Sequence, residues 1–555
     1  MATDLEINMK SILITALFFL VLASSISSSF VSAQKQEYHE IIIIGAGISG
    51  LAAAHELELD GYNDVVILES LDRPGGRVWT DRSWTDNTGK PIPLDLGASW
   101  ISGTIGNPIQ ELAERYNVTT YQTDYYNSIA VFDGNEEISQ ERAEESWKRY
   151  EYFKEKFLEN ERKNGTLDDS LSITVEKFID QQNLTPDQER DFRYEISWNI
   201  DNDYAGDVSD LSLLYYDKIG YIVGGEGSPE VVFPDGYDQI VDVIENALNT
   251  TKIRYNHVVE KVEYYDDIVV YTNQGQFSGK YVISTLPLGV LNDTTVRFEP
   301  DLSNEKKQAI KNIKMGKFDK VYFYFPEPFW DVDYDWINRI PLMGEEGQWL
   351  TFLNIYKIQN KTGHENIPIL LALNPEPYAD ELDTLTEDQI KHAGLEALRS
   401  IYGEKVPKDE DVKVMITHHG MDNNWVGAYS YLPKGATLED FDNLAKPIED
   451  KVFFAGEATT WHNPATVHGA YVSGLREANR IDMVISGTVE SPLDQNRHWN
   501  VFPEYVMCKN GKELVAIQDK DEFRPACVFS TNKTAFFERG WQPLLGIDKQ
   551  KSFLE

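Results

Sequence analysis

The chain of 555 residues has few basic side chains for its size, and this shortage excludes one class of partner. Lysine and arginine together number 51, against 91 aspartates and glutamates, so the formal net charge is −40. A surface of this sign repels phosphates, and nucleic acid is therefore excluded as a partner. Small organic cations would be attracted, although an acidic surface that keeps the protein soluble explains the balance equally well.

Cysteine is scarcer still, since the chain has only Cys508 and Cys527, both near the C-terminus. In an oxidising compartment we expect these two to pair and to close a small loop. Neither lies near the glycine-rich motifs described below, so no thiol is available there to hold a cofactor covalently. The sequence predicts no metal site.

Long apolar runs are also missing. The run from Ile12 to Ala23 is shorter than the eighteen or so residues that a membrane-spanning helix needs. It follows Lys10 and precedes a serine-rich stretch that ends at Ala33, so residues 1–33 resemble a secretory signal peptide. We expect a secreted or endomembrane-lumen protein, with a retained membrane anchor as the alternative. Asn-x-Thr triplets agree with this route, at Asn117, Asn164, Asn183, Asn249, Asn292, Asn360 and Asn532.

What the sequence does contain is a nucleotide-binding pattern. Residues 41–50 read Ile-Ile-Ile-Ile-Gly-Ala-Gly-Ile-Ser-Gly, and Glu69 closes a second apolar run soon afterwards. This order predicts a buried strand, a tight turn, a helix and a second strand ending in an acid that binds ribose. The helix N-terminus would face a pyrophosphate. The predicted dinucleotide contacts are Gly45, Ala46, Gly47, Ile48, Ser49, Gly50 and Glu69.

A second Gly-Gly-Arg motif at residues 75–77 indicates which dinucleotide binds. Arg77 would bring a guanidinium to the same pyrophosphate, a contact that NAD enzymes do not usually need. The motif resembles the flavin signature of the FAD-dependent amine oxidase family, and polyamine oxidases within it are the most similar. The resemblance continues, in family order, through residues 96–103, 284–291, 315–320, 456–459 and 466–471.

The resemblance implies an α/β fold in which a Rossmann-like FAD-binding domain is interleaved with an α+β substrate domain. The FAD-binding segments would be 38–110, 228–295 and 410–485, and the substrate segments 111–227 and 296–409. Residues 136–163 also predict one charged helix with an aromatic stripe. Residues 486–555 form a C-terminal extension whose role the sequence leaves open.

The resemblance also implies how FAD is held, non-covalently and by backbone as much as by side chains. Glu457 matches an acid beside the ribityl and pyrophosphate groups, and Val259 matches a position whose backbone meets the adenine. Further predicted contacts are Arg77, Gly97, Ala98, Ser99, Trp100, Thr466 and Val467.

Lys320 is the predicted catalytic residue. In the family a lysine near the flavin assists its reoxidation by O2, and residues 318–321 carry the matching context. Strand periodicity over residues 318–325 places Lys320, Tyr322 and Tyr324 on one face. A buried cation at this place would stabilise negative charge that develops on reduced oxygen.

The predicted substrate residues depart from the polyamine oxidase pattern. Tyr429 matches one of two rings that flank the amine, but Thr466 stands where many members have the second ring. The string around Thr466 resembles that of histone lysine demethylases. Ser102 stands where plant extracellular polyamine oxidases carry glutamate, and His419 replaces a tryptophan. Asp201 and Asp203 align with an acidic segment beside the substrate channel, although solvated loop acids are the simpler explanation for each.

The sequence therefore predicts an oxidase of spermine or spermidine that cuts a secondary amine carbon–nitrogen bond and reduces O2 to hydrogen peroxide. The alternatives are oxidation of another amine, such as a bulky secondary amine, a monoamine or an L-amino acid, and a non-catalytic flavin-bound protein. Against a histone demethylase stand the signal peptide, the acidic chain without a nuclear signal and the absence of a long helical insertion. The oligomeric state is not predicted.

Overall fold

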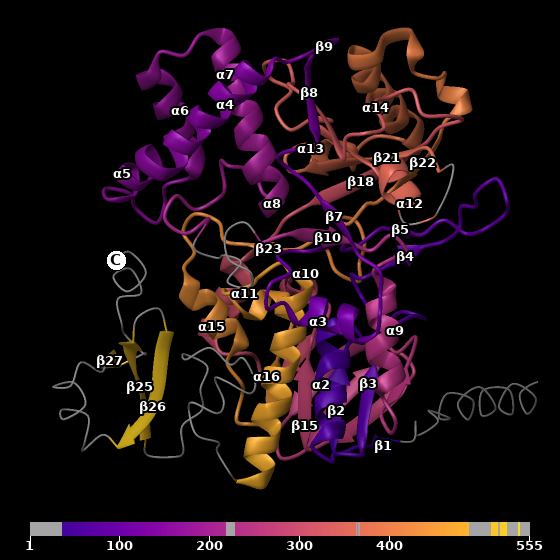
Figure 1. The fold of residues 1–555 in the computed structure, drawn as a ribbon. Helices are drawn as coiled ribbons and strands as arrows, with labels where there is room; N and C mark the ends of the chain where they lie inside the picture. Colours follow the sequence, from indigo (N-terminus) through magenta and orange to yellow (C-terminus); the bar gives the residue numbers. More distant parts are fainter. Residues whose placement is uncertain are drawn as a thin grey trace, which may run out of the picture.

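The computed structural model describes residues 36–217, 228–361, 363 and 367–487, together with the backbone of three C-terminal strands. Two bodies are visible, a lower one built on a parallel sheet and an upper one built on a larger sheet with a group of helices beside it (Figure 1). The predicted signal peptide, Cys508 and the side chain of Cys527 lie outside the described residues.

The lower body is organised by a five-stranded parallel sheet of order β11-β3-β2-β15-β24. Four of its strands are short, mostly apolar and buried runs, as parallel sheets require, while the edge strand β11 is polar and more exposed. Ile41 and Ile43 face a layer of helices, while Ile42 and Ile44 face a second sheet. The strands are β2 (Ile41–Ile44), β3 (Val65–Leu68), β11 (Lys252–Arg254), β15 (Tyr281–Ser284) and β24 (Val452–Phe454).

Glycines allow the helices on this sheet to pack closely. A Cβ on Gly50 would lie 2.0 Å from the Gly45 carbonyl oxygen, and one on Gly474 would lie 2.1 Å from that of Ser49. The first and last helices of the body therefore cross at a distance that only glycine permits. The helices are α2 (Ile48–Leu59), α3 (Pro108–Arg115), α9 (Asp238–Ala247) and α16 (Val467–Ser486).

The other face of the parallel sheet is covered by a mixed sheet of order β1-β14-β13-β12-β16. Residues 297–299 pair with β12 here, so this segment belongs to the lower body and not to the substrate segment predicted to begin at 296. The strands are β1 (Glu37–Tyr38), β12 (Val259–Tyr264), β13 (Ile268–Thr272), β14 (Gly275–Gly279) and β16 (Arg297–Glu299).

The upper body is built on a seven-stranded sheet of order β22-β18-β21-β20-β19-β8-β9. The alternation in β18 is as predicted, because Val321 and Phe323 pack against helices while Tyr322 lies in the cluster on the other face. Residues 413–416 pair with β18, so the predicted boundary at 410 lies too early. The strands are β8 (Ile129–Asp133), β9 (Glu136–Glu137), β18 (Phe318–Tyr324), β19 (Trp336–Arg339), β20 (Thr351–Asn354), β21 (Ile369–Pro375) and β22 (Lys413–Ile416).

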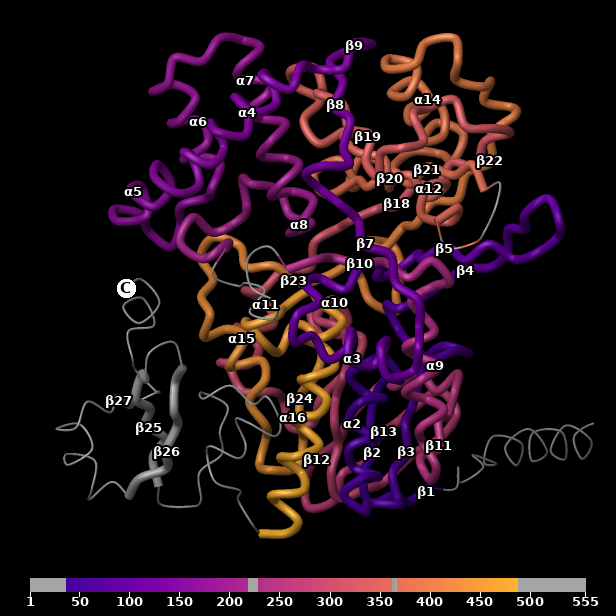
Figure 2. The backbone as a smooth tube through the Cα atoms, in the orientation of Figure 1, coloured from indigo at the N-terminus to yellow at the C-terminus, as the bar shows by residue number. Residues whose placement is uncertain are grey.

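Helices on both sides complete the upper body (Figure 2). The predicted single helix over 136–163 begins only at Gln140, because residues 136–137 form β9, and a π-helical turn, η1, interrupts it and buries Phe153 and Phe157. A second such turn, η2, precedes α8. The elements are α4 (Gln140–Tyr152), η1 (Phe153–Phe157), α5 (Leu158–Arg162), α6 (Leu171–Gln182), α7 (Pro186–Ile196), η2 (Ser197–Asp201), α8 (Asn202–Tyr204), α12 (Ile355–Lys361), α13 (Tyr378–Leu382) and α14 (Glu387–Tyr402).

Smaller elements join the bodies. An antiparallel sheet of order β6-β10-β7 lies between them, and β17 pairs with β23. None of the helices in the described ranges has both the length and the apolarity to cross a bilayer. The remaining elements are β4 (Thr80–Asp81), β5 (Leu94–Asp95), β6 (Trp100–Ile101), β7 (Tyr121–Thr123), β10 (Glu230–Val232), α10 (Leu288–Asp293), α11 (Asn304–Asn312), β17 (Lys314–Met315), β23 (Ser430–Tyr431), α15 (Leu438–Ala445), β25 (Lys512–Asp519), β26 (Glu522–Phe529) and β27 (Gln542–Pro543), with short 3-10 turns η3 (Gly403–Lys405), η4 (Asp409–Asp411) and η5 (Glu457–Thr459).

Candidate active site

The N-terminus of α2 is built to receive an anion. Gly47 is its N-cap, no side chain caps the helix and the first turn contains no acid. A Cβ on Gly47 would meet nothing within 4 Å, whereas Gly45 has a φ of +100° that favours glycine. Backbone N–H groups and the positive end of the helix dipole therefore face open space.

Glu69 lies beside this turn at the end of β3. Its carboxylate accepts hydrogen bonds from the backbone N–H groups of Ala46, at 2.6 Å, and Leu71, at 2.9 Å. The His257 N–H donates to the Glu69 carbonyl at 2.7 Å, which brings the start of β12 and Val259 alongside. The predicted ribose acid and the predicted adenine position are thus neighbours in space.

Arg77 and Glu457 form an ion pair of 2.9 Å on the same side. Arg77 also donates to the Ala428 carbonyl at 2.8 Å. The other Glu457 oxygen accepts from the Ser430 hydroxyl, at 2.6 Å, and from the Ala465 N–H, at 2.9 Å. The pair therefore ties the second glycine motif to the segments before β23 and before α16.

Thr466 has a structural use that the sequence did not indicate. It is the N-cap of α16: its hydroxyl accepts from the Gly469 N–H and donates to the Asn463 carbonyl, both at 2.9 Å. Val467 begins the helix and packs against the helical layer of the lower body. The Thr466 hydroxyl is therefore already engaged in capping, whichever group lies in front of it.

Lys320 is buried where the two bodies meet. Its ammonium donates to the carbonyls of Asp95, at 2.8 Å, and Gly97, at 2.5 Å, and to the Ser99 hydroxyl at 2.5 Å. It also lies 5.9 Å from the centre of the Trp100 ring. Burial lowers the pKa of Lys320 to about 8, although the Asp95 carboxylate opposes the shift. Lys320, the predicted catalytic residue, therefore lies next to the predicted flavin contacts 97–100.

His419 lies next to the same loop. Its Nε2 donates to the Leu96 carbonyl at 2.8 Å, and its backbone N–H donates to the Asp319 carboxylate at 3.2 Å. Burial lowers its pKa to about 4, so the ring is neutral at physiological pH. A neutral ring beside a buried ammonium adds no charge repulsion to the site.

The predicted substrate residues divide into two groups. The Tyr429 hydroxyl donates to the Asn202 carbonyl at 3.3 Å, and its ring lies 6.0 Å from that of Phe318, two residues before Lys320. Asp203 acts electrostatically on Tyr429. Its side chain is exposed, but the protein atoms that crowd it, followed by repulsion from Glu230, raise the pKa of Asp203 to about 7. Tyr429, Asp203 and Glu230 therefore form the first group.

Asp201 and Ser102 are placed differently. Asp201 is buried within its own segment beside Ser197, and burial raises its pKa to about 8. Ser102 follows β6 and is half-buried. The structure therefore separates the two acids that the sequence treated alike.

A row of aromatic rings connects the lysine to the acids. The ring of Trp100 lies 6.0 Å from that of Trp336, which lies 4.9 Å from Tyr125. Tyr125 is hydrogen-bonded to Glu230, whose pKa burial raises. Sequence reasoning missed Glu230 and Tyr125, because β10 and β7 become neighbours only through tertiary pairing. It also missed Asp95, which directly precedes the predicted flavin contacts that begin at Gly97.

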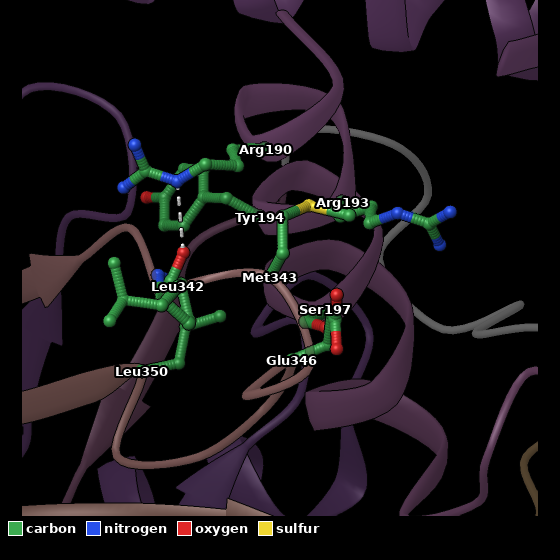
Figure 3. A pocket seen from close by; sticks show the side chains of 9 residues that line it. Arg190, Arg193, Tyr194, Ser197, Leu342, Met343, Glu346 and Leu350 are labelled. Carbon is green, nitrogen blue, oxygen red and sulfur yellow. Dashed lines mark hydrogen bonds between the residues drawn. The ribbon is translucent and has the colours of Figure 1, made fainter. Parts of the chain in front are cut away.

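A separate pocket with about 210 Å³ of open space lies between α7 and residues 341–350 (Figure 3). Its arginines are already paired, Arg190 with Asp133 and Arg193 with Glu176 and Glu189. None of the predicted site residues lines it. This pocket is therefore separate from the candidate active site.

A match to a protein-family model identifies the family of this chain. Residues 48–482 match the model for flavin containing amine oxidoreductase. The chain belongs to this family. Its members bind FAD, and the uncapped α2 N-terminus, Glu69 and Arg77 are the groups that would hold the pyrophosphate and ribose of FAD here.

Curated relatives carry names of different kinds. "Lysine-specific histone demethylase 1 homolog 1" of Arabidopsis thaliana is 31% identical over 80% of this chain and 52% of its own length. "Protein FLOWERING LOCUS D" of Arabidopsis thaliana is 30% identical over 88% of this chain and 62% of its own length. "Polyamine oxidase 3" of Oryza sativa subsp. japonica is 28% identical over 81% of this chain and 90% of its own length. The chain thus spans about half to three fifths of the length of the first two relatives.

We predict that Gly47→Ala folds but retains FAD weakly, because the added methyl group occupies the space through which the pyrophosphate approaches. The loss of affinity should be on the order of tenfold or more, equivalent to about 1.4 kcal/mol. FAD content after gel filtration and the thermal midpoint measure the two properties separately.

Gly50→Ala is the matched comparison. Its Cβ would meet backbone at 2.0 Å, so this variant should lower the thermal midpoint itself. Full FAD retention by Gly47→Ala would contradict the proposed approach of the pyrophosphate.

Proposed function

We propose that this flavin amine oxidase oxidises polyamines of the spermine and spermidine class, at a secondary amine carbon–nitrogen bond, with O2 reduced to hydrogen peroxide. The observation that carries the proposal is the acid pair Asp203 and Glu230 at the end of the aromatic row that starts at Lys320. FAD supplies the hydride acceptor and the reaction with O2 when it is bound.

The acid pair is suited to a substrate with more than one amine. Glu230 raises the pKa of Asp203 by repulsion, so the pair would gain from a cation placed between the two carboxyls. The partly exposed rings of Trp100 and Tyr125 would favour alkyl chains and ammonium groups, while the buried ring of Trp336 lies between them. A polyamine can place one nitrogen at the flavin and a second, charged nitrogen at Asp203 and Glu230, whereas a monoamine cannot do both.

The demethylase names of several relatives favour a second candidate, oxidation of a methylated lysine side chain. A lysine side chain has one charged nitrogen, and its peptide must continue outward from the site. The acid pair would then contact peptide basic groups instead of a second amine of the substrate.

The test is anaerobic reduction of the FAD-loaded protein, followed at the flavin absorbance, by spermine, spermidine, an N-acetylated polyamine, a monoamine, an L-amino acid and a dimethyl-lysine peptide. We expect the free polyamines to bleach the flavin fastest. Faster bleaching by any other compound would replace the proposed substrate. Bleaching by none of them, with dithionite still effective, would favour a non-catalytic flavoprotein.

Asp203→Asn should raise the KM for spermine by about tenfold and change the KM for a monoamine little, because only the polyamine loses a charged contact. Asp180→Asn, at an exposed position of α6, is the matched control. Equal effects of the two substitutions on spermine would contradict the role of Asp203.

Lys320→Met should slow flavin reoxidation by O2 by about 100-fold, because it removes the buried charge beside the reacting oxygen. FAD should stay bound. In the unsubstituted protein reoxidation should slow as pH rises through about 8, since the charged form of Lys320 is present below its pKa. Stopped-flow mixing of the reduced protein with O2 across pH measures both effects, and a pH profile that the substitution leaves unchanged would rule out this role.

We also propose that the protein enters the secretory pathway, on the basis of residues 1–33 and the Asn-x-Thr triplets. Of these asparagines, Asn117, Asn164, Asn183, Asn249 and Asn292 are exposed. Protein from the native source should lose mass on treatment with an N-glycosidase. An unchanged mass, together with an N-terminus that begins before residue 34, would contradict the proposal.

A further inference from the structure

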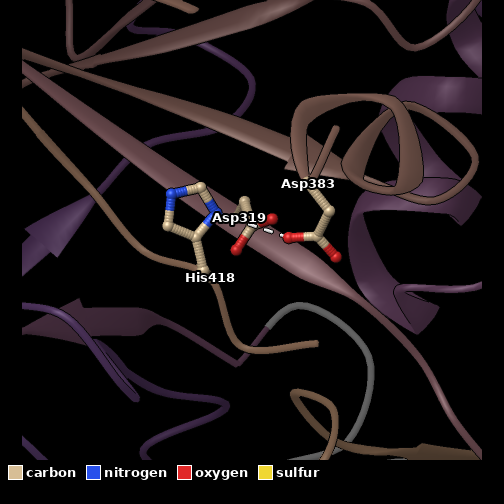
Figure 4. A group of neighbouring side chains, drawn as sticks. All are labelled: Asp319, Asp383 and His418. Atoms are coloured by element: carbon tan, nitrogen blue, oxygen red, sulfur yellow. Dashed lines mark hydrogen bonds and ion pairs between the residues drawn. The ribbon is translucent and has the colours of Figure 1, made fainter. Parts of the chain in front are cut away.

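A second group of side chains lies on the other face of β18, directly behind the Lys320 position. Asp319 belongs to β18, Asp383 follows α13 and His418 follows β22, and their ligand atoms all lie within 4.8 Å of one another. Figure 4 shows the three side chains converging from separate elements. Asp319 is fully buried, while His418 is about one third exposed and opens the cluster to solvent.

The buried oxygens of this cluster lack donors. Asp319 Oδ1 accepts from the Thr417 hydroxyl and the His419 N–H, both at 3.2 Å, but Asp319 Oδ2 has no hydrogen-bond donor. Asn374 lies opposite Asp319 in β21, is fully buried, and its Oδ1 also has no donor. Its Nδ2 is 3.5 Å from the Asp319 carbonyl. Buried oxygens without partners are costly, so they point to a ligand.

One internal cation reaches part of the cluster. The Lys317 ammonium is 3.4 Å from Asp383 Oδ2 and is also bonded to Asp380. This position still leaves Asp319 Oδ2 and Asn374 Oδ1 without a donor. His418 Nδ1 faces Asp383 Oδ1 at 3.4 Å. Lys317 therefore pairs directly with the outer carboxylate, Asp383, and leaves the inner one without a donor.

We propose that Asp319, Asp383 and His418 bind a divalent transition-metal ion, Zn²⁺ or Mn²⁺, with Asn374 Oδ1 as a further oxygen ligand. Two carboxylates and an imidazole match the donors that these ions accept, while Mg²⁺ and Ca²⁺ prefer oxygen alone. The two carboxylate charges balance the ion, and Lys317 then turns fully to Asp380.

The ion would have a positioning role, because its ligands lie on the face of β18 opposite Lys320. Thr417, which binds Asp319 Oδ1, also accepts the Lys320 backbone N–H at 2.8 Å. Holding residues 319, 383 and 418 together would fix β18 against the segment that carries His419. Metal binding should therefore raise the thermal midpoint.

The experiment uses the FAD-loaded protein, stripped of metal by a chelator and then titrated with Zn²⁺, Mn²⁺, Mg²⁺ and Ca²⁺ by calorimetry. We expect one equivalent of Zn²⁺ or Mn²⁺ to bind and little Mg²⁺ or Ca²⁺. Asp319→Asn and His418→Asn should each weaken binding by about 100-fold. Lys317→Met should strengthen binding, because the competing ammonium is gone.

His392→Asn is the matched control, since His392 bonds Asp409 at 2.8 Å in an exposed aspartate–histidine pair without a buried carboxylate. It should leave metal affinity unchanged. Flavin absorbance and the thermal midpoint identify variants that misfold. Failure of one equivalent to bind, or equal affinity in Asp319→Asn and His392→Asn, would overturn the proposal.

Discussion

The two bodies of this protein are joined by a buried ammonium group. Lys320 belongs to the upper sheet, but its three oxygen partners, Asp95, Gly97 and Ser99, come from the strand and loop that follow the lower glycine motifs. A charge this deeply buried is tolerated only with such partners. The Tyr322 hydroxyl donates to the same Asp95 carbonyl at 2.8 Å, so two residues of one strand hold the loop.

This contact constrains the residues around it. A Cβ on Gly97 would lie 1.8 Å from the Arg77 carbonyl oxygen, so the loop can pass between Lys320 and Arg77 only with glycine at this position. Arg77 in turn holds Glu457, which holds Ser430 and the turn before α16. The groups expected around FAD are thus also the groups that attach one body to the other, and cofactor binding and domain arrangement depend on the same contacts.

The features that could be predicted from the sequence are those that depend on residues close together in the chain. The strand, turn and helix at 41–59 and the alternation around Lys320 depend on neighbouring residues and on period, so both were predicted. The placement of β16 and β22 depends on which distant strand each pairs with, and the predicted boundaries therefore differed there. Glu230 and Asp95 gave no local signal, because their importance comes from what β10 and β18 bring next to them. Thr466 was assigned by alignment with a ring position, and its capping hydrogen bonds appear only in three dimensions.

Under the proposed function, the position of the acid that contacts the substrate depends on a detail of helix geometry. The π-helical turn η2 adds one residue to the helix that follows α7, and an extra residue rotates everything after it by about 100°. Asp201, the last residue of this turn, is buried beside Ser197, whereas Asp203 lies beyond the turn, is exposed, and interacts electrostatically with Glu230 and Tyr429. A regular α-helix through the same residues would turn the positions after the turn to a different side of the helix. Under the proposed function, η2 therefore decides which of the two acids faces the substrate, without any change near Lys320.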